Sequence, residues 1–302
     1  MKNLDEIQKL IQRAFVDRTL LGQSDVQEAL AFVLRELEAG RLRVATPQGL
    51  GPDAGAVEMT GDLRNWQVHA WVKEAVLLTL GWRRMRILGT VSKEIEPEQA
   101  RVHGQTLSYF DKLDVRSDLA EKGVRVVPPG TVREGAFVAR GSVIMPGYVN
   151  IGAYVSEGVM VDTWATVGSC AQIGARVHLA GGVGIGGVLE PAGARPVIIG
   201  DDAFVGSRCI VVEGAIVSSR AVLGAGVCIT ATTPVYDVTQ AERTEFRGYV
   251  PPGAVVAPGT REKEFPGGRV PLQCAYIIGY RSDKTDARVG INDILRENGL
   301  GV

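Results

Sequence analysis

The sequence has few cysteines and lacks any arrangement of them that indicates a metal site. Its four cysteines are Cys170, Cys209, Cys228 and Cys274, and no two of them form a C-x-x-C pair or share a metal-ligand spacing. Cys209 falls on a small, inward position of the repeat described below, so we expect a buried free thiol there. The sequence therefore predicts no bound metal.

The pattern of a signal peptide and long apolar runs are also lacking in the sequence. The chain begins Met-Lys-Asn-Leu-Asp-Glu, without the basic, apolar and small-residue succession of a signal peptide. No apolar run reaches the length of about 20 residues that a membrane span needs. We therefore expect a protein of the reducing cytoplasm.

The chain has almost no net charge. Its 33 basic and 34 acidic residues give a formal net charge of −1, so bulk electrostatics do not attract nucleic acid or an anionic membrane. The 45% apolar and 22% charged content is typical of a globular protein. Glycine is abundant at 38 residues, and most of the excess lies in the repeat, where turns need it.

The most informative feature is a six-residue period between residues 137 and 256. One aliphatic or aromatic side chain returns at every sixth position, and a small or short side chain follows it four residues later. Residues 190–196 and 230–248 interrupt the period. The recurring positions are Phe137, Val143, Val149, Val155, Val161, Val167, Ile173, Leu179, Ile185, Ile199, Val205, Val211, Val217, Leu223, Ile229, Val250 and Val256.

A period of six fits neither the 3.6 residues of a helix nor the alternation of a plain strand, and it is typical of the hexapeptide parallel β-helix. Each hexad forms a short strand whose recurring side chain points into a narrow prism. Burial of each aliphatic side chain contributes about 1.5–3 kcal/mol. We therefore predict a mainly β fold with a parallel β-helix over residues 121–258.

The flanking residues predict an α-rich N-terminal domain (1–120) that caps the first coil and a C-terminal cap (259–302). Apolar spacing predicts helices over 4–15, 26–37 and 65–80, with a short strand at 42–45. Residues 46–62 are rich in Gly, Pro and Asp and predict a mobile surface loop, and 230–248 predict a projecting loop. The tail predicts a strand at 272–280 and a helix at 290–298.

Several long segments resemble one enzyme family. They are Tyr109-Phe110-Asp111-Lys112, Arg125 to Pro129, Met145 to Tyr154, Met160 to Gly174, Val177-His178-Leu179, Gly181 to Pro191 and Val289 to Asn292. Together they resemble the tetrahydrodipicolinate N-succinyltransferases of the hexapeptide acyltransferase superfamily. The resemblance covers most of the chain after about residue 105 and, more weakly, the N-terminal helices.

The resemblance implies a left-handed β-helix and a homotrimer with active sites between subunits. It implies transfer of a succinyl group from succinyl-CoA to the amino nitrogen of ring-opened tetrahydrodipicolinate, in the diaminopimelate route to lysine. CoA would be a co-substrate, and no tightly bound cofactor is expected.

Three residues are site candidates because they match family positions. Arg125 matches a substrate-binding arginine, whose planar fork suits a carboxylate. Asp162 matches the acidic active-site residue, the candidate base for the attacking amine. Arg208 matches an arginine that suits the terminal carboxylate of a succinyl group. Without the resemblance, a surface ion pair for Arg125 and a polar corner residue for Asp162 would be the simpler interpretations.

One position departs from the family. Ile210, just before Val212-Glu213-Gly214, occupies the place of a family glutamate that is associated with the active site. An aliphatic side chain neither accepts a proton nor orients an amine. Two alternatives therefore stay open: a paralogue that acylates a related amino acid, with acetyl-CoA as one donor, and an impaired CoA-binding trimer.

Three other patterns are weaker. Gly182, Gly184 and Gly187 match G-x-G-x-x-G, but the six-residue period runs through them and no helix pattern follows, which excludes a dinucleotide loop. His178 has the residue type of the base in other hexapeptide acyltransferases, and we expect it to be a packed or edge histidine. Ser169-Cys170 lacks a nearby activating triad, so we expect direct acyl transfer.

Overall fold

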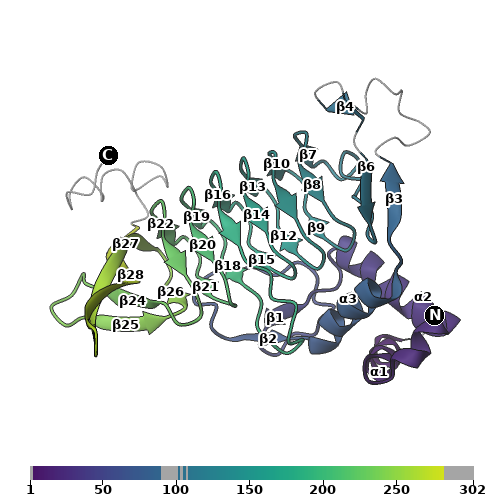
Figure 1. Ribbon diagram of the computed structural model, residues 1–302, viewed down its shortest axis with the longest axis horizontal. Coiled ribbons are helices and arrows are strands. Elements are labelled where there is room, and N and C mark those ends of the chain that lie inside the picture. Colours follow the sequence, from purple (N-terminus) through teal and green to yellow (C-terminus); the bar gives the residue numbers. More distant parts are fainter. Residues whose placement is uncertain (1–2, 90–100, 103–104, 107, 282–302) are drawn as a thin grey trace.

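A prism of short parallel strands forms the centre of the molecule. The computed structural model describes residues 3–89, 101–102, 105–106 and 108–281. Helices lie beside one end of the prism and a long two-stranded ribbon lies at the other end (Figure 1). The helix expected at 290–298 falls outside the described residues.

The prism has three faces, each a parallel sheet of two-residue strands, and we name each face after one of its strands. The β13 face contains β7 (Arg125–Val126), β10 (Val143–Ile144), β13 (Met160–Val161), β16 (His178–Leu179), β19 (Phe204–Val205) and β22 (Val222–Leu223). The β14 face contains β8 (Thr131–Val132), β11 (Tyr148–Val149), β14 (Thr166–Val167), β17 (Gly184–Ile185), β20 (Ile210–Val211) and β23 (Cys228–Ile229). The β15 face contains β9 (Phe137–Val138), β12 (Tyr154–Val155), β15 (Gln172–Ile173), β18 (Ile198–Ile199), β21 (Ile216–Val217) and β26 (Tyr249–Val250).

The second residue of each strand points into the prism and the first points outward. This confirms the inward positions expected from Val149 onward, which form one continuous buried cluster. The expectation is wrong for Phe137 and Val143, because Val138 and Ile144 are the buried residues of β9 and β10. The turn after Ile144 is one residue short, so the step from Ile144 to Val149 is five positions instead of six.

The N-terminal helices pack beside the first coils. They are α1 (Leu4–Val16), the 3-10 helix η1 (Arg18–Gly22), α2 (Ser24–Glu38) and α3 (Ala70–Trp82). Their apolar sides share a buried cluster with Ile151 and Cys170 of the prism. The interior of the first coil is instead closed by Leu119 and Val124, so the helices flank the prism more than they cap it. The strand pairs β3 (Arg86–Gly89) with β6 (Ser108–Asp111), and β4 (Arg101–Val102) with β5 (Gln105–Thr106), connect the two parts.

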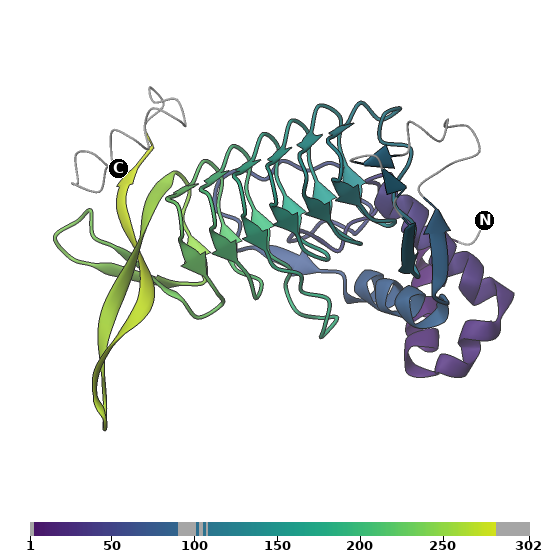
Figure 2. The same cartoon turned by 45° about the horizontal axis from the view of Figure 1, so that its top comes forward.

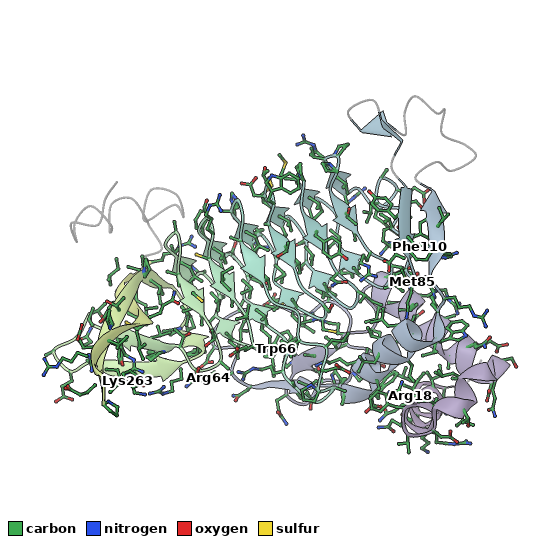
Figure 3. All side chains as sticks on the ribbon, viewed as in Figure 1. Arg18, Arg64, Trp66, Met85, Phe110 and Lys263 are labelled. Carbon is green, nitrogen blue, oxygen red and sulfur yellow. The ribbon has the colours of Figure 1, made fainter. Side chains whose placement is uncertain are left out.

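A segment that we call the N-terminal strap, residues 41–69, lies along the β15 face. Its backbone is anchored where Met59 N–H donates to Asp201 Oδ2 (3.0 Å) and Gly61 N–H donates to Ser219 Oγ (2.8 Å). Trp66 packs with Ile198 and Ile216 beneath the coils (Figure 3). The expectation of a mobile loop at 46–62 is therefore wrong, because the backbone polar groups of this segment bind the prism.

Two short strands of the strap also show that the helix predicted over residues 65–80 starts later than expected. β1 (Ala45–Pro47) pairs with β2 (Trp66–Val68), so the helix expected from residue 65 begins only at Ala70. The predicted helix began too early because Trp66 and His69 fit the 3.6-residue spacing of apolar positions in a helix. In the structure, pairing with β1 holds residues 66–68 as a strand.

The buried Arg43 ties the strap to the same face. Its guanidinium stacks 3.7 Å from the Tyr154 ring centroid, and its Nε donates to Gln172 Oε1 at 3.0 Å. Burial lowers the pKa of Arg43 to about 10. A cation in this position is held by ring stacking and one amide, and it fixes the strap over β12 and β15.

The C-terminal end is a β structure that leaves the prism. The projecting loop expected at 230–248 is an antiparallel hairpin of β24 (Pro234–Asp237) and β25 (Thr244–Arg247). β27 (Ala254–Phe265) pairs with β22 and then runs outward with β28 (Gly268–Tyr280), which confirms the strand expected at 272–280. The ribbon extends well away from the coils, with Lys263 near its tip (Figures 2 and 3). Among the described residues, no helix is both long and apolar enough to cross a membrane.

Asp201 is the residue on which docking of the strap depends most directly. Its carboxylate accepts from Ala175 N–H (2.7 Å) and Met59 N–H (3.0 Å), and all three groups are buried. Asp201→Ala leaves two buried donors unpaired, so we expect the free energy of unfolding to fall by about 2–4 kcal/mol. Urea denaturation measures this loss.

Glu264→Ala is the matched control, because this carboxylate pairs with Arg269 on the exposed ribbon. We expect it to change the free energy of unfolding by less than about 1 kcal/mol. Equal stability of the two variants would contradict the role of Asp201.

Candidate active site on the open edge

Two of the three prism faces remain free for a ligand or another chain. The strap covers the β15 face, whereas the outward side chains of the β13 and β14 faces are mostly half-buried or exposed. These two faces meet at the turns 127–130, 145–147, 162–165, 180–183, 206–209 and 224–227, which we call the open edge. The sequence candidates Asp162 and Arg208 both lie on it.

Asp162 follows β13 directly and begins its turn. Its N–H donates to Leu179 O (2.9 Å), which stacks this turn on the next coil. Its Oδ1 accepts from the N–H of Thr163 (2.6 Å) and from the Thr163 hydroxyl (3.2 Å). These bonds, the backbone one first, lower the pKa of Asp162 against the opposing effect of burial. Asp162 is therefore a fixed anion at the surface of the prism.

His178 lies one coil further on and directly beside this anion. His178 and Met160 are in register on the β13 face, and His178 Nε2 is 3.6 Å from Asp162 Oδ2. The ring also packs against Phe204, with the centroids 5.1 Å apart. The expected packed histidine thus has a carboxylate neighbour. Asp162 and His178 are sixteen positions apart in the sequence. The register pairs His178 with Met160, which stands two positions before Asp162, and this offset within the repeat is the signal that could have predicted the pair.

Arg208 occupies the turn two coils beyond Asp162. Its backbone has φ 59°, and its N–H donates to Gly181 O (3.0 Å). The exposed Trp164 holds the same left-handed position in the turn of Asp162, with φ 60° and 67% exposure, and Gly182 holds it in the coil between them. A tryptophan that accepts this unfavourable conformation while exposed was not singled out from the sequence.

Arg125 lies on the β13 face at the start of the prism. It is exposed and in register with Val143, which in turn is in register with Met160. Since neighbouring coils are about 4.8 Å apart, Arg125 lies about 10 Å before the coil of Asp162, and Arg208 lies about 10 Å after it. The structure therefore aligns the three candidates along about 19 Å of the prism without bringing them into contact.

Ile210 points outward from the β14 face. It is 39% exposed and lies over Gly184, where an added Cβ would come within 2.8 Å of Ile210 Cδ1. Its other neighbour in the register is Cys228. Ile210 and the side chain of Asp162 thus belong to different parts of the surface within one chain, one on a face and the other on its edge.

The weaker sequence patterns have structural explanations. Gly182 is a turn residue and Gly184 a strand residue of the prism, and Gly187 lies in the loop 186–197 that follows. Cys170 is fully buried, and burial raises the pKa of its thiol to about 12, which makes it a poor nucleophile. Nowhere in the described part of the chain do three His, Cys, Asp or Glu side chains gather as a metal site.

A groove lies at the other edge of the β14 face. It is lined by Gly186, Gly187 and Gly214 together with Arg195 of the loop 186–197, whose Nε donates to Gly214 O at 2.9 Å. The buried Lys73 of α3 fixes this loop, because its Nζ donates to Ala194 O (2.8 Å) and Pro191 O (3.3 Å).

Comparison with known proteins gives consistent matches along the chain. Residues 6–81 match the model of the tetrahydrodipicolinate N-succinyltransferase N-terminal domain, and residues 196–231 match the hexapeptide repeat of succinyl-transferase. A putative 2,3,4,5-tetrahydropyridine-2-carboxylate N-succinyltransferase from Campylobacter jejuni covers 83% of this chain and 62% of its own. Its TM-score of 0.40 and 15% identity are too low to add to the argument.

Curated relatives match over nearly the full length. A 2,3,4,5-tetrahydropyridine-2,6-dicarboxylate N-succinyltransferase from Acidovorax ebreus is 43% identical, over 97% of this chain and 99% of its own. One of the same name from Aromatoleum aromaticum is 45% identical, again over 97% and 99%. The resemblance inferred from the sequence is therefore confirmed, and the chain belongs to the tetrahydrodipicolinate N-succinyltransferase family.

Proposed function

We propose that this protein transfers a succinyl group from succinyl-CoA to the amino group of ring-opened tetrahydrodipicolinate, a step of lysine and diaminopimelate biosynthesis. The observation that carries the proposal is the full-length identity of 43% to relatives that bear this activity in their name. CoA acts as a co-substrate. All four cysteines are free thiols, which suits the reducing cytoplasm in which we expect the reaction.

Asp162 is the residue on which removal of the proton from the amine depends. The amine nitrogen attacks the thioester carbonyl carbon and the C–N bond forms. The C–S bond then breaks with its electron pair on sulfur, and the proton removed from the amine passes to sulfur, so that CoA leaves as the thiol. Arg125 and Arg208 bind carboxylates, the first of the amino-acid substrate and the second of the succinyl group. The burial of Cys170 supports direct transfer without an acyl-enzyme intermediate.

We infer that the site is completed by a second copy of the chain in a homotrimer of left-handed β-helices. Two observations support this assembly: of the three faces only the β13 and β14 faces remain uncovered, and the three candidate residues extend along about 19 Å of the β13 face and the adjoining open edge. A neighbouring prism placed against the open edge supplies the remaining contacts.

The first test is removal of the Asp162 carboxylate. Asp162→Ala keeps the backbone bond to Leu179 and removes only an outward side chain, so we expect an unchanged oligomer. We expect kcat/KM to fall roughly 100- to 10,000-fold. CoA release from succinyl-CoA in the presence of tetrahydrodipicolinate measures activity, and light scattering measures the oligomer.

Asp114→Ala is the control, because this carboxylate lies in an exposed ion pair with Arg86. We expect it to keep wild-type activity. A wild-type rate for Asp162→Ala would remove Asp162 from the mechanism, and lack of CoA release by the wild-type protein would reject the proposed function.

A second test concerns the acyl donor. Arg208→Asn removes the guanidinium, and asparagine tolerates the left-handed backbone at this position. Since a charge-assisted bond contributes about 1.5–3 kcal/mol, we expect KM for succinyl-CoA to rise roughly tenfold or more. Activity with acetyl-CoA, which has no second carboxylate, should not decrease. A parallel decrease with both donors would contradict the role of Arg208.

The exposed Ile210 favours one alternative, a paralogue that acylates a related amino acid and accepts acetyl-CoA. Ile210→Glu tests it, because the space over Gly184 already holds a side chain of this length. If Ile210 alters specificity, we expect the ratio of kcat/KM values to shift towards tetrahydrodipicolinate and succinyl-CoA. Ile210→Leu is the matched control and should leave the ratio unchanged. Identical kinetics of Ile210→Glu and wild type would show that the position has no influence.

A further inference from the structure

One turn of the open edge lies bare between two turns that present large side chains. Trp164, Gly182 and Arg208 occupy the same left-handed position in three successive turns, with φ values of 60°, 72° and 59°. Gly182 N–H donates to Thr163 O (2.9 Å) on one side, and on the other Arg208 N–H donates to Gly181 O (3.0 Å). The backbones of Trp164 and Arg208 are therefore two coil spacings, or about 10 Å, apart. We call the gap over Gly181 and Gly182 the glycine notch.

The glycine notch is open in the described part of the chain. A Cβ added to Gly182 would meet one atom within 4 Å outside its chain neighbours, Arg208 Cγ at 3.4 Å. A Cβ on Gly181 would likewise meet Thr163 O alone, at 3.5 Å. A single alkyl chain in contact with groups on both sides needs about 7–8 Å between them, since carbon atoms in contact lie 3.5–4.0 Å apart. The notch therefore has room for one extended chain.

Trp164 forms one wall of the notch under unfavourable conditions. The left-handed conformation is costly for a residue with a bulky side chain, and the indole is 67% exposed, so burial within this chain compensates for little of that cost. Residues in sparsely populated conformations gather at ligand sites, and such an outlier is a reason to look for a function. The indole offers a flat apolar surface to a ligand.

The opposite wall and the floor offer hydrogen-bond donors. Arg208 is exposed, and its guanidinium has no ion-pair partner among the described residues. Within the same part of the chain, the N–H of Gly181 has no hydrogen-bond acceptor either. A guanidinium and a backbone N–H both suit a carboxylate. The notch thus has an apolar wall on one side and donors for an anion on the other.

We infer that the glycine notch binds the acyl chain of the donor, and that Trp164 and Gly182 determine the acyl group that is accepted. The methylene groups lie against the indole, the terminal carboxylate lies at Arg208, and Gly182 provides the space between them. The thioester carbonyl lies at the other end, because Asp162 begins the turn that contains Trp164. The inference rests on the proposed function and deepens it, since it adds two specificity-determining residues to that site.

The first test fills the notch. Gly182→Asn places a side chain in the gap, and asparagine tolerates φ 72°. CoA is the matched ligand without an acyl chain, and calorimetry measures the Kd of each. Since a hydrogen bond to a charged group contributes enough for about a tenfold effect, we expect Kd for succinyl-CoA to rise about tenfold or more. Kd for CoA should stay within about threefold of wild type, because CoA leaves the notch empty.

Gly226→Asn is the matched control. Gly226 has the same position in the turn one coil beyond Arg208, with φ 77° and open space around an added Cβ. It lies outside the notch, so both Kd values should equal those of the wild type. An equal rise of Kd for succinyl-CoA in Gly226→Asn and Gly182→Asn would contradict the position of the acyl chain.

The second test removes the indole wall. Glutaryl-CoA is one methylene longer than succinyl-CoA, and a fitted site discriminates one methylene by about tenfold or more. We expect Trp164→Asn to reduce the preference for succinyl-CoA to less than about threefold. Asparagine relieves the left-handed strain, so the urea midpoint should not fall below that of the wild type. A tryptophan with a purely structural role would instead lower the midpoint and keep the preference.

Two results would overturn the inference. One is a wild-type protein that binds succinyl-CoA no more tightly than CoA, and the other is an unchanged ratio of these two Kd values in both Gly182→Asn and Trp164→Asn. Both are binding measurements and do not depend on turnover. A wild-type protein that prefers succinyl-CoA but releases no CoA with tetrahydrodipicolinate would reject the proposed acceptor instead, so the two failures are distinguishable.

Discussion

The whole molecule depends on the register between successive coils. Each two-residue strand bonds to the strands one coil before and after it, and the second residue of each strand adds to a single buried column of Val, Ile and Leu. Because side chains alternate in direction along a strand, this column leaves every first residue on the outside. The interior thus determines which side chains are available for binding, including Arg125, His178 and Ile210.

The strap decides which of these outward side chains stay available. It covers the β15 face from Tyr154 to Tyr249 through the Arg43 stacking, the Asp201 carboxylate and the Trp66 cluster. Of three faces with similar strands, one is therefore covered by the strap and two remain accessible to ligands or to another chain. Chemistry and assembly are then restricted to the open edge, where Asp162 and Arg208 lie.

The prism was predictable because its signal is periodic and local. Val149 and the later recurring residues were identified from spacing alone, whereas the role of Asp162, which its motif suggested, stays a prediction. Phe137 and Val143 were misassigned because one missing residue in the turn after Ile144 shifts the phase without interrupting the pattern. The strap was missed because its bonds to Asp201 and Ser219 join residues about 140 and 160 positions apart.

The neighbourhood of Asp162 shows the same limit for the candidate site. The sequence contains both Asp162 and His178, but only the coil geometry converts a separation of sixteen residues into 3.6 Å. Conversely, Arg125 and Arg208 were expected in one site, and the structure separates each from the coil of Asp162 by two steps. Whether two residues meet here depends on their position within a coil more than on their distance in the chain.

The turns of the open edge are evenly spaced along the prism, because successive coils are stacked at a constant distance. Groups at equivalent positions of this edge can differ in height only by whole multiples of about 4.8 Å, since each coil adds one step. Arg208 stands two steps from Asp162, and loss or gain of a single coil between them would move it by one step without disturbing the buried column. A β-helix can therefore change the distance between two ligand-binding groups in discrete increments of one coil. Loops on a layered fold do not offer this form of adjustment.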